Sequence, residues 1–218
     1  SLILYGPPGT GKTTRAQLIA QRPQAQFERL SGVESDVAEM RRVLSSGANR
    51  LANTGTSTLL FVDEIHRFNK SQQDVLLPDV ENGVIKLIGA TTHNPFFFVN
   101  SPLVSRSQIF ELQPLGEHSL RTLLETAIKD EERGLGSMNL HVEDAAVQHL
   151  AKLADGDARK ALNSLEIAAL TTPQGEDGLV HIDLDAAEEC IQKKAVVYDG
   201  DGDAHYDTIS AFIKSMRG

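Results

Sequence analysis

One short segment near the start of the chain, residues 6–13, constrains the fold more than any other feature. It matches the phosphate-loop pattern G-x-x-x-x-G-K-T. The apolar run 2–5 before it is typical of a buried strand, and residues 12–21 after it have helical spacing. Glycines let backbone N–H groups turn towards a phosphate, and the following helix directs its positive end at the anion. The segment predicts an α/β domain with an anion site; an unrelated Gly/Pro turn is the alternative.

The pattern beyond the loop predicts two parts. Strand candidates at 26–30, 58–62, 84–90 and 108–112 alternate with helical patterns at 35–52 and 71–81, where Pro78 should kink or end the second helix. This alternation predicts a parallel, doubly wound sheet. After Pro114, helical segments are expected at 117–132, 143–153, 157–170, 183–194 and 204–216, with no strand runs. We therefore expect an α/β core followed by an all-α part.

Two adjacent carboxylates, Asp63 and Glu64, follow the apolar run 58–62. A buried strand of a parallel sheet delivers such side chains to its carboxyl end, where α/β sheets bind ligands. With Lys12 reaching the β- and γ-phosphates and Thr13 offering a hydroxyl to Mg²⁺, Asp63 is expected to hold the metal through water. Glu64 is then placed to polarise the attacking water. The alternative is a strand that ends in an acidic cap.

Composition narrows the function classes. Residues 1–115 carry 11 basic and 10 acidic side chains, whereas residues 116–218 carry 10 basic and 20 acidic ones. The acidic half is expected to be a solvated surface. Its excess of negative charge argues against contacts with nucleic-acid phosphates there. No apolar run approaches the roughly 18 residues of a membrane span, and a single cysteine, Cys190, excludes an internal disulfide framework.

Three segments together carry a family resemblance: 6–13, 63–74 and 88–95. The second reads Asp-Glu-Ile-His-Arg-Phe-Asn-Lys-Ser-Gln-Gln-Asp and the third Ile-Gly-Ala-Thr-Thr-His-Asn-Pro. They resemble AAA+ ATPases of the replication-associated recombination protein A family, which includes the eukaryotic Werner-helicase-interacting ATPase. The resemblance runs over essentially the whole chain, and the second segment is its most specific part.

The resemblance implies further site residues. Thr92 resembles the sensor of the γ-phosphate or lytic water. Arg106 resembles an arginine finger that acts on nucleotide bound to a neighbouring subunit, and Arg159 resembles the lid arginine that reads the γ-phosphate. The full set expected to bind ATP is Gly6, Pro7, Pro8, Gly9, Thr10, Gly11, Lys12, Thr13, Thr14, Asp63 and Arg159, with Glu64, Lys12, Thr92, Arg106 and Arg159 acting in hydrolysis.

The resemblance also implies an organisation and partners. We expect a nucleotide-binding core at 1–115 that lacks its lead-in, a helical lid at 116–193, and the start of a truncated oligomerisation domain at 194–218. The implied protein is a Mg²⁺-dependent ATPase that acts on single-stranded, gapped or duplex-end DNA in replication-fork maintenance, recombination and repair. It would form a homo-oligomer, expected as a tetramer, and would meet single-stranded-DNA-binding protein or the replisome. It would be cytoplasmic and nucleoid-associated in a bacterium, or nuclear in a eukaryote, with no membrane partner.

Three other functions stay open at this point. A clamp-loader subunit would share the motifs, but Ser107 stands where clamp loaders usually have Cys. A DExH helicase would match Asp63 to His66, but it needs a second α/β domain. A nucleotide-binding module without hydrolysis conflicts with the intact set of Lys12, Asp63 and Glu64.

Three features depart from the family pattern or lack a clear role. His93 stands where the family usually has Glu, and Phe96 and Phe98 flank Phe97 in place of polar residues. We expect the three Phe residues to pack locally, with base stacking as the alternative. His66 is expected to pack at a helix start, with a relay to Glu64 as the alternative.

Overall fold

The computed structural model describes residues 1–20 and 25–190, and the chain divides into two compact units between Pro114 and Leu115. Each unit is described by itself. The end of the predicted helix 183–194, the whole of the one at 204–216 and the expected domain 194–218 lie outside the described residues. In the part that the structure describes, no helix is both long and apolar enough to cross a membrane.

The first unit is built on a parallel sheet. Its strands are β1 (Leu2–Tyr5), β2 (Gln26–Ser31), β3 (Thr58–Asp63), β4 (Ile85–Thr91) and β5 (Gln108–Glu111). They lie in the order β2-β3-β4-β1-β5, and all the pairings are parallel. β1 is therefore interior to the sheet, between β4 and β5. The predicted parallel sheet is confirmed.

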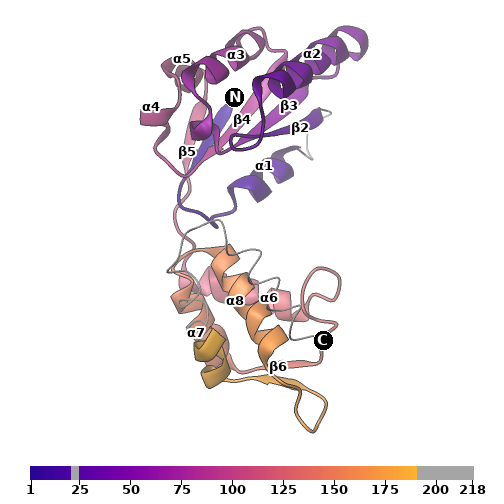
Figure 1. The fold of residues 1–218 in the computed structure, drawn as a ribbon, viewed down its shortest axis with the longest axis vertical. Helices are drawn as coiled ribbons and strands as arrows, with labels where there is room; N and C mark the ends of the chain where they lie inside the picture. The colour runs from indigo at the N-terminus through magenta and orange to yellow at the C-terminus, as the bar shows by residue number, and fades with distance from the viewer. Residues whose placement is uncertain (21–24, 191–218) are drawn as a thin grey trace. The chain divides into compact units, whose positions relative to one another are not determined.

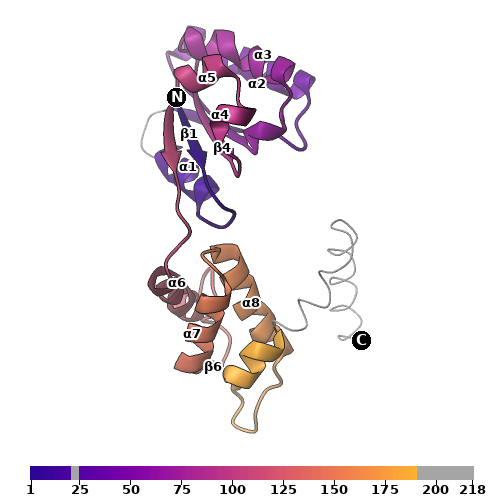
Figure 2. The same ribbon diagram turned by 90° about the vertical axis from the view of Figure 1, so that its left-hand side faces the viewer.

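Helices cover both faces of this sheet, as a doubly wound fold requires. The helices of the unit are α1 (Lys12–Ala20), α2 (Val37–Thr54), α3 (Lys70–Glu81), α4 (Pro95–Phe98) and α5 (Ser101–Ser105), with a 3₁₀ turn η1 (Ile65–Arg67) after β3. α2, α3 and α5 pack on one face and α1 lies on the other (Figures 1 and 2). α3 continues through Pro78 for three residues before it ends.

Alternation along the strands explains the two cores. In β3, Leu60 and Val62 enter the core with α2 and α3, whereas Leu59 and Phe61 enter the core with α1. Residues Thr58 to Val62 are all buried because both faces are covered. This explains why the run looks continuously apolar in the sequence.

The second unit is mainly helical but contains a small sheet. Helices α6 (Glu117–Lys129), α7 (Asp144–Leu153) and α8 (Ala158–Thr171) share one core with Ile182 and Ala187. β6 (Leu140–Val142) and β7 (Val180–Ile182) pair in parallel. The expectation of an all-α second half with no strands was therefore wrong in this detail. Three residues per strand are too few to give a visible alternation of apolar and polar residues.

Gly32, which follows β2, allows the close approach of the turn after β3. Its N–H donates to the Asp63 carbonyl at 2.7 Å. A Cβ atom at this position would lie 2.2 Å from the Glu64 carbonyl oxygen and 2.9 Å from its carbon. These are backbone atoms, so the clash could be relieved only by moving the turn that carries Glu64.

We expect Gly32→Ala to lower the free energy of unfolding by about 1–3 kcal/mol, the usual cost of overpacking. Gly116→Ser is the control: a Cβ there meets nothing within 4 Å and serine is a favoured residue at this N-cap of α6, so its effect should stay within about 0.5 kcal/mol. Urea unfolding followed by circular dichroism measures both. A Gly32→Ala protein as stable as the wild type would show that the turn yields easily.

Candidate nucleotide site

The phosphate loop lies between β1 and α1, as the sequence predicts. Gly6, Gly9 and Gly11 have φ values of 148°, 69° and 82°, which side chains rarely adopt. A Cβ on Gly6 would lie 2.2 Å from the Leu112 carbonyl oxygen, so this glycine also permits close contact with the end of β5. The loop conformation thus depends on the glycines that define the motif.

Lys12 is the first residue of α1, and its ammonium lies inside the loop. Nζ donates to the carbonyl oxygens of Gly6 and Pro7, each at 2.8 Å, and the residue is buried. The buried Thr10 hydroxyl also donates to Pro7, at 2.9 Å. Thr13 and Thr14 follow in the first turn of α1. The loop therefore gathers a cation, a helix N-terminus and three hydroxyl-bearing residues in one place.

β3 brings the two predicted carboxylates to the same edge of the sheet. Asp63 ends the strand, and its Oδ2 lies 3.0 Å from Nη2 of Arg29 on β2. Glu64 follows in the left-handed region, with φ 50° and ψ 48°, which is uncommon for a residue with a side chain. This turn separates the directions of the two neighbouring side chains. Asp63 meets Arg29, whereas Glu64 Oε2 lies 3.1 Å from Nδ1 of His66.

β4 supplies the third component. Its last residue, Thr91, pairs with Tyr5 of β1, and the Gly6 N–H donates to the Thr91 carbonyl at 3.2 Å. Thr92, the predicted sensor, comes next; it is half-buried and makes no hydrogen bond within the described part of the chain. The carboxyl ends of β1, β3 and β4 thus gather the phosphate loop, Asp63, Glu64 and Thr92.

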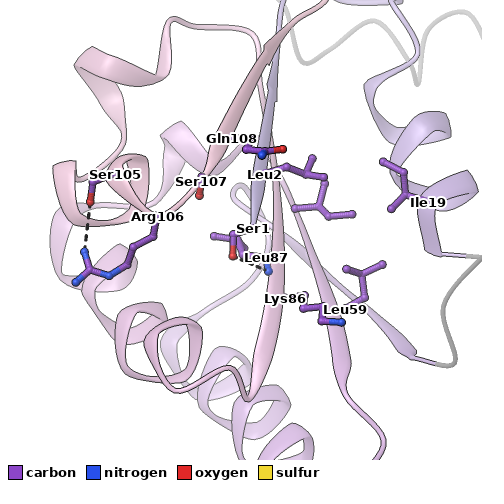
Figure 3. A pocket seen from close by; sticks show the side chains of 11 residues that line it. Ser1, Leu2, Ile19, Leu59, Lys86, Leu87, Ser105, Arg106, Ser107 and Gln108 are labelled. Carbon is purple, nitrogen blue, oxygen red and sulfur yellow. Dashed lines mark hydrogen bonds between the residues drawn. The ribbon is translucent and has the colours of Figure 1, made fainter.

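Two predicted site residues lie elsewhere. Arg106 caps α5 just before β5, whose first residue pairs with Leu2 at the amino end of β1. It forms an ion pair with Glu81, with Nη2 2.7 Å from Oε1. It also borders an open cavity of about 650 Å³ at the amino end of β1 (Figure 3). Arg159 is exposed in the first turn of α8, after Asp157, which caps the helix by accepting from its N–H at 2.8 Å. It belongs to the second unit.

Sequence reasoning missed Gln73, which ties the loops around the site together. Its buried side chain donates to the carbonyls of Phe68 and Phe98, at 2.9 and 3.0 Å, and accepts from the Asn100 N–H at 2.7 Å. It lies inside the segment 63–74 that carries the resemblance, but a glutamine on a helix gives no signal of burial. Thr91 was missed for a similar reason, because two adjacent threonines look alike in the sequence.

The aromatic segment after β4 differs from the expected local packing. Phe96, Phe97 and Phe98 form α4, and Phe97 is 81% exposed. Phe96 is 65% and Phe98 is 49% exposed, although Phe98 also contacts His93, with ring centroids 4.8 Å apart. The packing expectation was wrong for Phe96 and Phe97, because an α4 of four residues is too short to bury more than one face.

The parallel sheet and the phosphate loop at its carboxyl edge are the arrangement of a P-loop domain, and the comparisons with known proteins agree. Residues 2–115 match the ATPase family associated with various cellular activities (AAA), and the chain belongs to this family. Residues 136–217 match the AAA C-terminal domain.

Relatives and solved structures narrow the resemblance further. The chain is 48% identical over its full length to replication-associated recombination protein A of Bacillus subtilis, and covers 51% of that protein. It is 40% identical to the ATPase WRNIP1 of Dictyostelium discoideum, all of the chain matching 26% of that protein. The RuvB Holliday junction branch migration motor of Thermotoga maritima has a similar structure, with a TM-score of 0.69, 28% identity, and coverage of 100% of this chain and 69% of that one. The resemblance to the replication-associated recombination protein A family is confirmed. The chain spans about half the length of the first of these relatives.

Gln73→Met should destabilise the first unit, because it leaves the three backbone groups bonded by Gln73 without their partner. Each unsatisfied buried group costs about 1–3 kcal/mol. Gln17→Met on the exposed side of α1 is the matched control and should leave stability unchanged. Thermal unfolding compares the two variants. Equal melting temperatures would mean that water replaces the lost hydrogen bonds.

Proposed function

We propose that the chain is the catalytic part of a Mg²⁺-dependent AAA+ ATPase. The observation that carries this proposal is the gathering of the phosphate loop, Asp63, Glu64 and Thr92 at the carboxyl ends of β1, β3 and β4. Lys12 and the loop N–H groups bind the β- and γ-phosphates. Glu64 accepts a proton from the attacking water, and Thr92 contacts the γ-phosphate or that water.

The oxygen-rich donor set fits a magnesium ion. Thr13 contributes a hydroxyl and Asp63 a carboxylate, which are the ligand types that Mg²⁺ prefers. A cationic group, the Arg29 guanidinium, already lies 3.0 Å from Asp63, so positive charge is accommodated at this carboxylate. When bound, the ion neutralises charge on the β- and γ-phosphate oxygens.

The position of Arg106 supports its action on a neighbouring subunit. It lies at the amino edge of the sheet, beside the pair Leu2–Gln108, whereas the phosphate loop begins after Tyr5 at the opposite edge. Four strand residues at about 3.3 Å each separate the two edges. Arg106 therefore serves nucleotide bound to another protomer, and a homo-oligomer, expected as a tetramer, is part of the proposal. Arg159 is proposed to read the γ-phosphate from the second unit.

We propose DNA as the target of the motor. The relative from B. subtilis is named for replication-associated recombination, and the structural neighbour is a Holliday junction branch migration motor. By this analogy the protein acts in replication-fork maintenance, recombination and repair, with single-stranded-DNA-binding protein or replisome components as partners. Residues 1–115 are assigned as the ATPase core, 116–193 as the lid and 194–218 to an oligomerisation domain. The place of action is the cytoplasm, at the nucleoid, in a bacterium, or the nucleus in a eukaryote.

Glu64→Gln and Asp63→Asn should separate hydrolysis from metal binding. Glu64→Gln should keep nucleotide affinity and lose about 10²–10⁴-fold in kcat, the usual contribution of a general base. Asp63→Asn should instead raise the Mg²⁺ concentration needed for half-maximal turnover. Phosphate release is measured over a Mg²⁺ series, with and without single-stranded, gapped or blunt-ended DNA. Equal rates for Glu64→Gln and wild type would remove Glu64 as the base, and no stimulation by any DNA would contradict the proposed target.

Mixing two inactive variants tests the arginine finger. Lys12→Ala loses its own phosphate site but keeps Arg106, whereas Arg106→Ala keeps the phosphate site. In a mixed oligomer, the first variant supplies the finger to the second, so the mixture should hydrolyse ATP faster than either variant alone. Turnover is measured across mixing ratios. If Arg106→Ala alone matches the wild type, Arg106 is not the finger.

A further inference from the structure

His66 is held between the proposed catalytic glutamate and the end of the neighbouring strand. Its Nδ1 lies 3.1 Å from Oε2 of Glu64 and 3.0 Å from Oγ1 of Thr91. Its side chain is only 8% exposed, although it belongs to the short turn η1 at the edge of the sheet. The ring therefore connects the ends of β3 and β4 through one nitrogen atom.

Glu64 has a left-handed backbone conformation and a partly buried side chain. Two contacts at the Glu64 carbonyl hold this left-handed conformation. The carbonyl accepts from the Arg67 N–H at 2.8 Å, and Gly32 packs against it. Its Oε2 is buried and makes no well-aligned hydrogen bond among the described residues. The His66 ring nitrogen is within reach of this oxygen. Water can reach the carboxylate only through the other oxygen.

The protonation of the ring decides whether the contact is attractive. Burial lowers the pKa of His66, with smaller lowering effects from His93 and Arg67, while Glu64 opposes the shift. A neutral ring carries one proton, on either nitrogen. A carboxylate only accepts hydrogen bonds, so the 3.1 Å contact with Glu64 is attractive when the proton is on Nδ1, whose aligned hydrogen-bond partner in this structure is the Thr91 hydroxyl. With the proton on Nε2, Nδ1 would instead accept the hydroxyl of Thr91.

Other contacts fix the plane of the ring. The His93 ring meets it edge-on, with centroids 4.4 Å apart, and Phe98 lies 6.2 Å away. Thr91 is itself held, because its hydroxyl oxygen accepts from the His93 N–H at 3.0 Å. The position of Nδ1 is therefore set by the packing of His93 and Phe98 against the ring and by the contact with Thr91 of β4. A ring held in this way can fix the orientation of the neighbouring Glu64 side chain.

We infer that His66 is a positioning residue for Glu64: the close contact of its Nδ1 with Oε2 fixes that oxygen, so that the other carboxylate oxygen can accept from the attacking water. The inference deepens the proposed function and rests on it, because it assumes that Glu64 is the base. It gives His66 a role in kcat and none in the binding of nucleotide.

Three substitutions separate the contact of Nδ1 with Glu64 from the packing of the ring. His66→Asn places an amide nitrogen close to the position of Nδ1, His66→Gln moves it outward, and His66→Phe keeps a ring without a donor. His66→Gln and His66→Phe should lower kcat by about 10–100-fold, within the range that general-base catalysis supplies. Their KM for ATP and their nucleotide affinity should not change. His66→Asn should recover most of the turnover. His118→Phe, on the exposed side of α6, is the matched control.

Glu64→Gln, measured in the same series, distinguishes the possible failures. If Glu64→Gln turns over as fast as the wild type, the proposed function itself is wrong. If Glu64→Gln is impaired but His66→Gln and His66→Phe are not, only the positioning role is overturned. A His66→Asn variant as slow as His66→Phe, with an unchanged melting temperature, would also overturn it.

A double substitution provides a second readout that does not depend on rescue. If His66 acts only through Glu64, Glu64→Gln with His66→Phe should keep the residual turnover of Glu64→Gln alone. A further loss in the double variant, with nucleotide binding intact, would show that His66 acts on its own and would overturn the inference.

Discussion

The parallel register of β1, β3 and β4 is the constraint on which the site depends. In a parallel sheet, neighbouring strands end at the same edge, so the loops that follow them meet there. The pairings Tyr5 with Thr91 and Val62 with Gly89 align these three ends. Residues 5, 63 and 91 are far apart in the chain, yet the loops after them share one edge. Burial on both faces keeps this register, because a slip of one residue would exchange the two apolar cores.

Unusual backbone conformations concentrate at the same edge. Glu64 is one of only two non-glycine residues with positive φ in the described ranges 1–20 and 25–190, and three glycines of the phosphate loop share this property. Such conformations persist only where the surroundings hold them in place. Here the surroundings are the end of β5 against Gly6, the approach of Gly32 to the Glu64 carbonyl, and the Thr91–His66–Glu64 contacts. The strain therefore coincides with the residues to which we assign chemistry.

Much of the first unit could be predicted from the sequence, because β3 and β4 are mainly apolar runs and the loop motif is specific. The carboxyl-edge position of Asp63 and Glu64 followed from the run before them. What could not be predicted depends on tertiary contacts: α4 and α5 are too short to show a period, and β6 and β7 have three residues each. The burial of His66 and Gln73, and the exposure of Phe97, are set by how turns pack. A single side chain carries no periodic signal of that packing.

The separation of Arg106 from the phosphate loop bears on assembly. Within one protomer, the proposed finger and the proposed phosphate site lie at opposite edges of the same sheet. If each serves a different neighbour, the contact must join two unlike surfaces, which builds a ring or a filament rather than a two-fold dimer. In the described structure, Glu81 holds the Arg106 guanidinium at 2.7 Å. An incoming subunit must therefore offer a stronger anionic partner than this half-exposed carboxylate, and the phosphates of a bound nucleotide meet that requirement.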